Sequence, residues 1–255
     1  MREDIYAPIN FLPDEPGLGG SILELFQSEA RPKLGNESQH FRIRGRVEVS
    51  ILLEELGWDY RVHEINIGQD EQFDPAFLKL CPNNKIPAIT DSDGPDGAPI
   101  SLFESGAILI YLANKAGRFI SVDPRRHMEE IQWVMFQMAN VGPMFGQMHH
   151  FRTKLEPEIA YARTRYLRET HRLYAVMNSR LEASEYLAGP DYGVADIATW
   201  PWVSRFEWHE IDWANYSHLR RWFDDIWARP AVKRGRAVPR VGAIWAGAFP
   251  DQEES

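Results

Sequence analysis

Cysteine is nearly absent from this chain. One is present among 255 residues, which excludes an internal disulfide framework and a Cys-x-x-Cys redox motif. No apolar run approaches the roughly 20 residues of a membrane-spanning helix. Positive charge is in deficit, and the formal net charge of −9 at pH 7 disfavours nucleic acid and anionic membranes as partners. No apolar segment of the kind that marks a secretory signal follows Met1-Arg2-Glu3-Asp4. We therefore expect a cytoplasmic protein that binds neither nucleic acid nor membrane.

The composition is that of an ordinary globular protein, with 44% hydrophobic and 25% charged residues. In the first half, short strands alternate with helices. We expect strands at Ile22–Phe26, Tyr60–Ile67, Ala88–Thr90 and just before Glu104, and helices over Arg46–Leu56, Glu71–Leu80 and Ser105–Lys115. From Pro124 the pattern is helical, over Arg125–Met144, Pro157–Leu181, a segment that begins at Gly193, and His218–Ala228. This order is typical of an α/β domain followed by an all-α domain.

Domain boundaries follow from the same pattern. Residues 1–20, rich in proline and glycine, are predicted to form an extended arm. Residues 21–120 would form the α/β domain, residues 124–245 the helical domain, and residues 246–255 a flexible tail. Residues 27–45 are predicted to be a long loop between the first strand and the first helix, and loops of that length are usually functional or disordered. Its residues 31–40 are polar and turn-rich, and residues 41–46 have the alternative of continuing into the helix.

Two segments of the α/β half organise the rest of the chain. They are Cys81-Pro82-Asn83-Asn84-Lys85-Ile86-Pro87-Ala88-Ile89 and Leu102-Phe103-Glu104-Ser105-Gly106-Ala107-Ile108-Leu109-Ile110-Tyr111-Leu112. The second one places Ser105 as the N-cap of a helix, and the start of a helix favours negative charge. Together the segments resemble the glutathione-binding core of the glutathione transferase family. The resemblance extends from about Val49 to Val238 and is strongest with the bacterial nu class, which includes glutathione-dependent disulfide-bond oxidoreductases.

This resemblance implies an architecture and an activity. The architecture is that of the cytosolic glutathione transferases, an N-terminal thioredoxin-like domain followed by a C-terminal helical bundle, usually in a dimer. The activity is a transferase or a disulfide-bond oxidoreductase that uses glutathione, reduced or oxidised, as co-substrate. Its second substrate would be a small apolar or disulfide compound.

The resemblance also implies where glutathione binds. Glutathione has two carboxylates and one ammonium group, so its site needs a cation, an acid and N–H donors at a helix start. Lys85 suits the glycyl carboxylate, and Glu104 and Ser105 suit the γ-glutamyl end. The backbone of Ile86 would pair with the cysteinyl amide, presented by Pro87, which is cis in the family. Further candidates are Gln72 and Asn84. Taken singly, each of these residues has an ordinary alternative as a helix cap or a surface side chain.

The sequence departs from the family where the thiol should be activated. Lowering a thiol pKa from about 8.5 by two units takes about 2.7 kcal/mol of preferential thiolate stabilisation. Nu-class proteins use a Thr and an Asn from a Thr-Pro-Asn-Gly run before the first helix, where this chain has Ile43-Arg44-Gly45-Arg46. Asn36 and Ser38 are our catalytic candidates. Arg44, Arg46 and Ser28 are alternatives, and Asn and Ser in long loops also serve simply as turn formers.

The segment Gly142–Phe151 resembles the nu-class segment that faces the second-substrate pocket, so His149, His150 and Arg152 are candidates for its wall. The two histidines do not form a metal pair, because neighbours on a helix point apart and no third ligand has the spacing for zinc. We expect no metal. Trp200 and Trp202 belong to the bundle core or line an aromatic pocket. Cys81 is either a buried small residue or a partner in a mixed disulfide with glutathione.

Two other functions stay open at this point. The altered loop is also compatible with a catalytically weak, glutathione-binding partner subunit of a dimer. The aromatic content is compatible with a specialised transferase for aromatic electrophiles.

Overall fold

The computed structural model describes residues 41–44, 47–152 and 159–238, all within one compact unit. Several predicted features lie outside the described residues: the arm at 1–20, the strand Ile22–Phe26, Ser28, Asn36, Ser38, Arg46, the side chain of Arg44 and the tail at 246–255. The predicted domain boundaries remain predictions.

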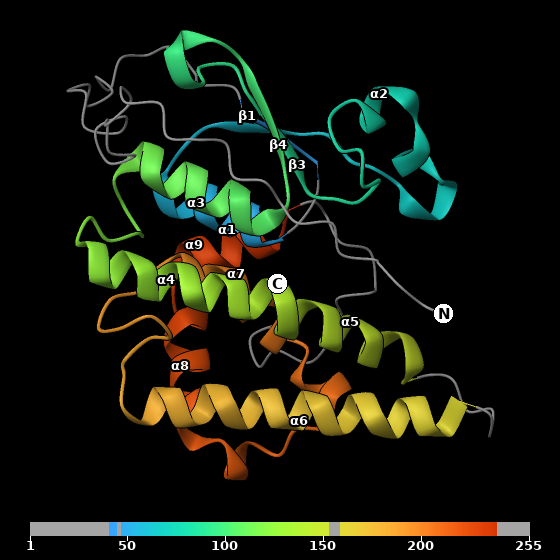
Figure 1. The fold of residues 1–255 in the computed structure, drawn as a ribbon, viewed down its shortest axis with the longest axis vertical. Helices are drawn as coiled ribbons and strands as arrows, with labels where there is room; N and C mark the ends of the chain where they lie inside the picture. Colours follow the sequence, from blue (N-terminus) through green and yellow to red (C-terminus); the bar gives the residue numbers. More distant parts are fainter. Residues whose placement is uncertain (1–40, 45–46, 153–158, 239–255) are drawn as a thin grey trace, which may run out of the picture. The chain divides into compact units, whose positions relative to one another are not determined.

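A four-stranded sheet of order β2-β1-β3-β4 forms the centre of the N-terminal half (Figure 1). Its strands are β1 (Phe41–Arg44), β2 (Tyr60–Val62), β3 (Ala88–Asp91) and β4 (Ile100–Phe103). β1 runs parallel to β2, with Phe41 opposite Tyr60. β3 runs antiparallel to β1 and to β4, with Ile89 opposite both Ile43 and Leu102. The parallel pair and the helix between its strands form a β-α-β unit.

β1 is the main correction to the sequence analysis. Phe41–Arg44 was predicted to belong to the 27–45 loop, whereas it forms an inner strand of the sheet. The four residues alternate apolar and charged, which is the two-residue period of a strand. Only residues 45 and 46 separate this strand from the next helix. The loop prediction is therefore wrong for its last part.

Two further elements are shorter than predicted. β2 ends at Val62, before the predicted Ile67, and the chain then forms a 3₁₀ turn at Ile67–Gln69. The predicted helix at 71–80 is a 3₁₀ turn, Glu71–Phe73, followed by α2 (Pro75–Leu78). Phe77 is buried, whereas Phe73 is 52% exposed. The side chain of Asp74 caps α2 at the amide of Ala76, which ends the first turn and begins a new one.

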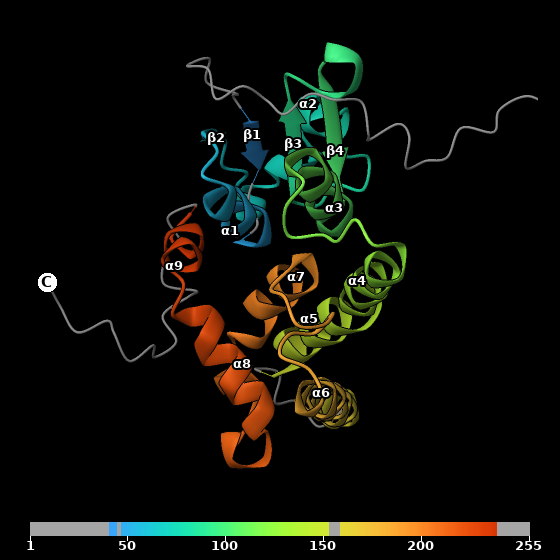
Figure 2. The same cartoon turned by 90° about the vertical axis from the view of Figure 1, so that its left-hand side faces the viewer.

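Two helices stand between the sheet and the helical half, α1 (Val47–Leu56) and α3 (Ser105–Ala116) (Figure 2). α3 ends at Gly117, whose φ of 62° is the left-handed conformation of a helix C-cap. The N-cap of α3 is Glu104, one residue before the predicted Ser105. This shift places Ser105 inside the first turn, where its backbone N–H points out of the helix end.

The helical half contains α4 (Pro124–Phe136), α5 (Gly142–Phe151), α6 (Ala160–Glu182), α7 (Val194–Val203), α8 (Ser217–Trp227) and α9 (Pro230–Arg236). Asp123 caps α4, accepting hydrogen bonds from the amides of Arg125 and Arg126 at 3.1 and 3.0 Å. The helix predicted to stop at Met144 instead passes through a π-helical turn, Gln137–Val141, and continues to Phe151. The helix expected after Gly193 is present, with Asp196 accepting from the Gly193 amide at 3.0 Å.

One hydrophobic core joins the two halves. Its buried side chains come from α1, α3 and β3 on one side and from α4 to α9 on the other. α9 packs directly on α1, and a Cβ on Gly235 would lie 2.5 Å from the Cα of Ile51. The pocket described below lies between two halves that share this core.

Candidate functional site

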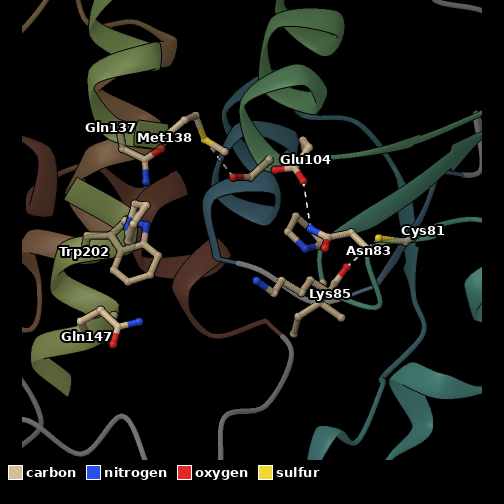
Figure 3. Close-up of a pocket in the computed structure, with 14 residues that line it drawn as sticks. Cys81, Asn83, Lys85, Glu104, Gln137, Met138, Gln147 and Trp202 are labelled. Atoms are coloured by element: carbon tan, nitrogen blue, oxygen red, sulfur yellow. Dashed lines mark hydrogen bonds between the residues drawn. The ribbon is translucent and has the colours of Figure 1, made fainter. Parts of the chain in front are cut away.

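A pocket of about 400 Å³ opens between the two halves. Its walls come from the loop before β3, the start of α3, the π-helical turn, α5 and α7. Figure 3 shows the two walls facing each other, with Lys85, Asn83 and Glu104 on one side and Gln137, Gln147 and Trp202 on the other. Among the residues that the structure describes, those lining the pocket are Cys81, Asn83, Lys85, Ile86, Pro87, Glu104, Ser105, Gln137, Met138, Gly142, Pro143, Gly146, Gln147 and Trp202.

The wall from the N-terminal half carries the charge. Among these lining residues Lys85 is the only cation and Glu104 the only anion. Both side chains are exposed, and Asn83 Nδ2 donates to Glu104 Oε1 at 3.4 Å. A single positive and a single negative side chain on one wall match a ligand that is itself a zwitterion.

The start of α3 supplies N–H donors to the same wall. The first amides of a helix have no intrahelical acceptor, and no side-chain bond caps this end. The Ser105 side chain is buried, and its hydroxyl lies 3.6 Å from the sulfur of Met138, a weak acceptor. This hydroxyl and the helix amides can therefore receive a carboxylate.

Glu104 is held in an uncommon backbone conformation, with φ 67° and ψ 115°. A non-glycine residue at positive φ is unusual, and such residues gather at functional sites. This conformation turns the chain from β4 into α3, so that the Glu104 side chain and the α3 amides line the same pocket. The Ile86–Pro87 peptide bond is cis, as the family resemblance implied, and both residues line the pocket.

Cys81 is buried at the base of the Lys85 loop, with 1% of its surface exposed. Its Sγ donates to the backbone carbonyl of Lys85 at 3.1 Å. The side chain packs with Phe77 and Ala88 in a small separate cluster. This setting agrees with the structural alternative for Cys81, because a thiol so enclosed is poorly placed to meet a dissolved disulfide.

The wall from the helical half is neutral. Gln137 and Met138 come from the π-helical turn, Gln147 from α5 and Trp202 from α7. Two glycines let side chains come close: a Cβ on Gly142 would lie 3.1 Å from Gln137 Nε2, and a Cβ on Gly106 would lie 2.9 Å from Met138 Cγ. Amides, an indole and a thioether suit an uncharged second substrate.

The structure brings five predicted site residues to the pocket: Lys85, Ile86, Pro87, Glu104 and Ser105. Gln72 and Asn84 are not among the lining residues. Gln72 donates to Asp70 at 3.4 Å, and Asn84 is a loop residue with φ 47°.

The three predicted second-substrate residues are also absent from the described lining. His149 lies 2.7 Å from His209, between ring nitrogens, and the ring of His150 meets the edge of Phe151. The guanidinium of Arg152 lies 4.3 Å from the centre of the Trp208 ring. His149 nevertheless contacts the pocket indirectly, because its ring is stacked beside that of Trp202.

The lining residues that sequence reasoning missed are Asn83, Gln137 and Met138. Gly142, Pro143, Gly146 and Gln147 were not named singly, but they lie in the segment Gly142–Phe151 that was expected to face the pocket. Asn83 stands within the recognised motif and could have been included on that ground. Gln137 and Met138 had no such signal, because the π-helical turn that carries them breaks the 3.6-residue period. Trp202 was predicted as core or pocket wall, and it is both, being 7% exposed.

Within the described residues no group of three or more metal-ligating side chains comes together. Among the helices of the same part of the chain, none has the length and apolar character needed to cross a membrane.

Comparison with known proteins agrees with this geometry. Residues 38–114 match the glutathione S-transferase N-terminal domain family, and residues 138–230 match its C-terminal domain family. Disulfide-bond oxidoreductase YfcG of Escherichia coli is 45% identical over 196 residues, covering 76% of this chain and 91% of that protein. Disulfide-bond oxidoreductase YghU of the same organism is 36% identical over 207 residues, covering 76% of this chain and 71% of YghU.

Solved structures agree as well. A glutathione transferase from Burkholderia graminis, with two glutathione molecules bound per subunit, has a TM-score of 0.76 and 42% identity, covering 82% of this chain and 92% of that one. A glutathione transferase from Pseudomonas putida, with glutathione disulfide bound, has a TM-score of 0.75 and 37% identity, covering 81% and 94%. The predicted family and the thioredoxin-like plus helical fold are confirmed. The chain belongs to the glutathione transferase family.

Proposed function

We propose that the protein is a glutathione-dependent disulfide-bond oxidoreductase that binds glutathione against Lys85, Glu104 and the start of α3. The supporting observation is the charged wall of the pocket, where one cation, one anion and a set of helix amides stand together. The names of the relatives support the same activity.

Each group of glutathione has a chemical counterpart on that wall. The glycyl carboxylate pairs with the Lys85 ammonium, and the γ-glutamyl ammonium pairs with Glu104. The γ-glutamyl carboxylate accepts hydrogen bonds from the Ser105 hydroxyl and the α3 amides. The backbone of Ile86 pairs with the cysteinyl amide. Charge-assisted hydrogen bonds of this kind are roughly twice as strong as neutral ones.

The reaction is thiol–disulfide exchange. A glutathione thiolate attacks one sulfur of the substrate disulfide, the S–S bond breaks, and the released thiolate takes up a proton. A second glutathione thiolate then attacks the mixed disulfide, giving glutathione disulfide and the second thiol. Two electrons pass from two glutathione thiols to one substrate disulfide. The candidates for thiol activation, Asn36 and Ser38, remain predictions because they lie outside the described residues.

The test measures binding and turnover separately. Glutathione binding is followed by calorimetry, and reduction of hydroxyethyl disulfide is followed by coupling glutathione disulfide formation to glutathione reductase and NADPH. We expect binding at millimolar glutathione or below, and turnover clearly above the uncatalysed rate. Binding without turnover would favour the partner-subunit alternative, whereas the absence of binding to either glutathione species would refute the proposal.

We also propose a homodimer in the cytoplasm. Support for the dimer comes from α4, where Met128 and Met135 are 62% and 48% exposed and lie seven residues apart on one helix face. The single thiol, Cys81, suits a reducing compartment. Light scattering after size exclusion is expected to give twice the chain mass. The double variant Met128→Glu/Met135→Glu should be monomeric, while Val122→Glu, at an 87% exposed position in the linker, should stay dimeric. A dimeric double variant would refute this face as the interface.

A further inference from the structure

His149 lies directly behind the neutral wall of the pocket. Its ring and the Trp202 indole have centroids 6.0 Å apart, and their planes differ by 15°. Trp202 itself lines the pocket and is only 7% exposed, so the rest of its ring is covered by protein. On the opposite wall are Lys85 and Glu104 (Figure 3). The indole therefore forms a surface for the second substrate, and His149 supports it.

A chain of hydrogen bonds fixes the orientation of His149. Arg205 can only donate, so its Nη1 donates to His149 Nδ1 at 3.3 Å. His149 must then carry its proton on Nε2, which donates to His209 Nε2 at 2.7 Å. His209 in turn carries its proton on Nδ1, which donates to the Tyr174 oxygen at 2.8 Å. Tyr174 completes the chain by donating to the carbonyl of Val203 at 3.3 Å.

This series of hydrogen bonds connects four separate elements. His149 is on α5, Tyr174 is on α6, Val203 ends α7, and His209 ends the 3₁₀ turn Phe206–His209. His209 and Tyr174 are fully buried, and the two imidazole planes are parallel to within 2°. A rotation of the His149 ring would break its bonds to Arg205 and His209 together. The stacking partner of Trp202 is therefore held in one orientation.

Arg205 reinforces the same wall from a second direction. Its guanidinium carbon lies 5.5 Å from the centre of the Trp202 ring, within the range of a cation–π contact. Arg205 thus contacts both the indole and the ring that supports it.

We propose that His149 is a positioning residue, which holds the Trp202 indole in the pocket wall and thereby sets the affinity for an uncharged second substrate. It does not touch glutathione, whose counterparts lie on the other wall. This inference rests on the proposed function, because it concerns the second substrate of that reaction.

Two variants distinguish the effect of the His149 ring from the effect of its hydrogen bonds. His149→Gln removes the ring and retains a carboxamide that can still accept from Arg205 and donate to His209. His149→Phe retains a flat ring and removes both hydrogen bonds. His150→Gln is the matched control, because this neighbouring histidine packs on Phe151 instead of Trp202. Thermal unfolding checks that each variant folds.

The kinetic readout is the KM of each substrate. We expect His149→Gln to raise the KM for hydroxyethyl disulfide about two- to ten-fold, the range of one aromatic pair. The KM for glutathione should stay within two-fold, and His150→Gln should match the wild type. His149→Phe should restore most of the affinity if stacking is what positions the indole.

A second readout does not need turnover. The Trp202 signal in the near-ultraviolet circular dichroism spectrum is obtained as wild type minus Trp202→Phe. It should change in His149→Gln and not in His150→Gln. An unchanged signal, equal effects of the two glutamine variants, or a parallel rise in both KM values would overturn the inference. Failure of the proposed function is distinguishable, since the wild type itself would then show no turnover while the spectral comparison still decides the position of Trp202.

Discussion

Glu104 has a strained backbone and is proposed to bind the ligand ammonium, and the two effects are separable by mutation. Its φ of 67° and ψ of 115° lie in a region that side chains other than glycine rarely adopt. Its carboxylate is exposed and accepts a hydrogen bond from Asn83 at 3.4 Å. Glu104→Gly removes the strain and the carboxylate, whereas Glu104→Gln removes only the charge.

The magnitudes can be worked out for each variant. Residues in such conformations cost about 1–3 kcal/mol, while the freedom that glycine adds to the unfolded chain offsets about 0.4–1 kcal/mol of the relief. The long, exposed bond to Asn83 contributes little. We expect Glu104→Gly to gain about 1 kcal/mol in unfolding free energy, or about 2–4 °C in Tm for a chain of this length. Glu104→Gln keeps the backbone and should stay within about 0.5 kcal/mol of the wild type.

Glutathione binding should weaken in the same variants, although Glu104→Gly is expected to be more stable. A hydrogen bond to a charged group contributes about 1.5–3 kcal/mol, so losing the pairing with the ligand ammonium should weaken glutathione binding about 10- to 150-fold. Both Glu104 variants should show this loss. The expected combination for Glu104→Gly is thus a more stable protein with weaker glutathione binding.

The assay is urea unfolding without ligand, together with calorimetric titration of glutathione at the same pH. Asp96→Gly serves as a control, because Asp96 also has positive φ, 61°, but with ψ 18° it lies in the left-handed region that Asp tolerates, outside the pocket lining. It should bind glutathione normally and gain less stability. Finding Glu104→Gly less stable than Glu104→Gln would refute the strain argument, and normal binding by both would refute the role of the carboxylate.

Three further predictions concern other residues. Lys85→Met should raise the KM for glutathione about 10- to 150-fold by removing the cation for the glycyl carboxylate, with Lys79→Met as a silent control; an unchanged KM would contradict this. Gly235→Ala should cost about 1–3 kcal/mol in urea unfolding, because the new Cβ would meet the Ile51 backbone at 2.5 Å. Burial raises the pKa of Asp196 to about 6, above its unfolded value of about 3.9. Between these two values the folded state holds a proton that the unfolded state has lost. The contribution of protonated Asp196 to the unfolding free energy is therefore fully present below about pH 4 and is lost as the pH rises through about 6. Asp196→Asn should remove this dependence of the unfolding free energy on pH. A pH dependence equal to that of the wild type would refute the raised pKa of Asp196.

The charged wall of the pocket was predictable because neighbouring parts of the sequence determine it. Lys85, Ile86 and Pro87 are consecutive, and Glu104 and Ser105 follow on the other side of one β hairpin. The antiparallel pairing of β3 with β4, Ala88 opposite Phe103, brings these two groups together without reference to any distant part of the chain. In a motif of this kind the local strand pairing determines how the site residues are arranged.

The first strand could not be chosen from propensity alone. Ile22–Phe26 is a longer apolar run than Phe41–Arg44, and for this reason it was predicted to be the first strand. Pairing decides the matter instead: β1 must reach β2 on one side and β3 on the other, and Phe41–Arg44 does so directly before α1. The family match, which begins at residue 38, agrees with this position.

The neutral wall was the least predictable part, because long-range contacts determine it. Helical periodicity gives no warning of the π-helical turn that brings Gln137 into the pocket. The sequence around His149 also does not indicate that this residue forms a hydrogen bond with His209, sixty residues later, or that its ring stacks beside Trp202. The family resemblance named His149 for the wall of a second-substrate pocket, whereas in the structure His149 is absent from the described lining and stacks beside Trp202, which lines the pocket. The difference matters chemically: a histidine in the lining would exchange protons or hydrogen bonds with substrate, whereas one behind an indole can act only through the position of that ring. Substitutions at His149 should therefore alter which disulfides bind and leave the charged wall of the pocket unchanged.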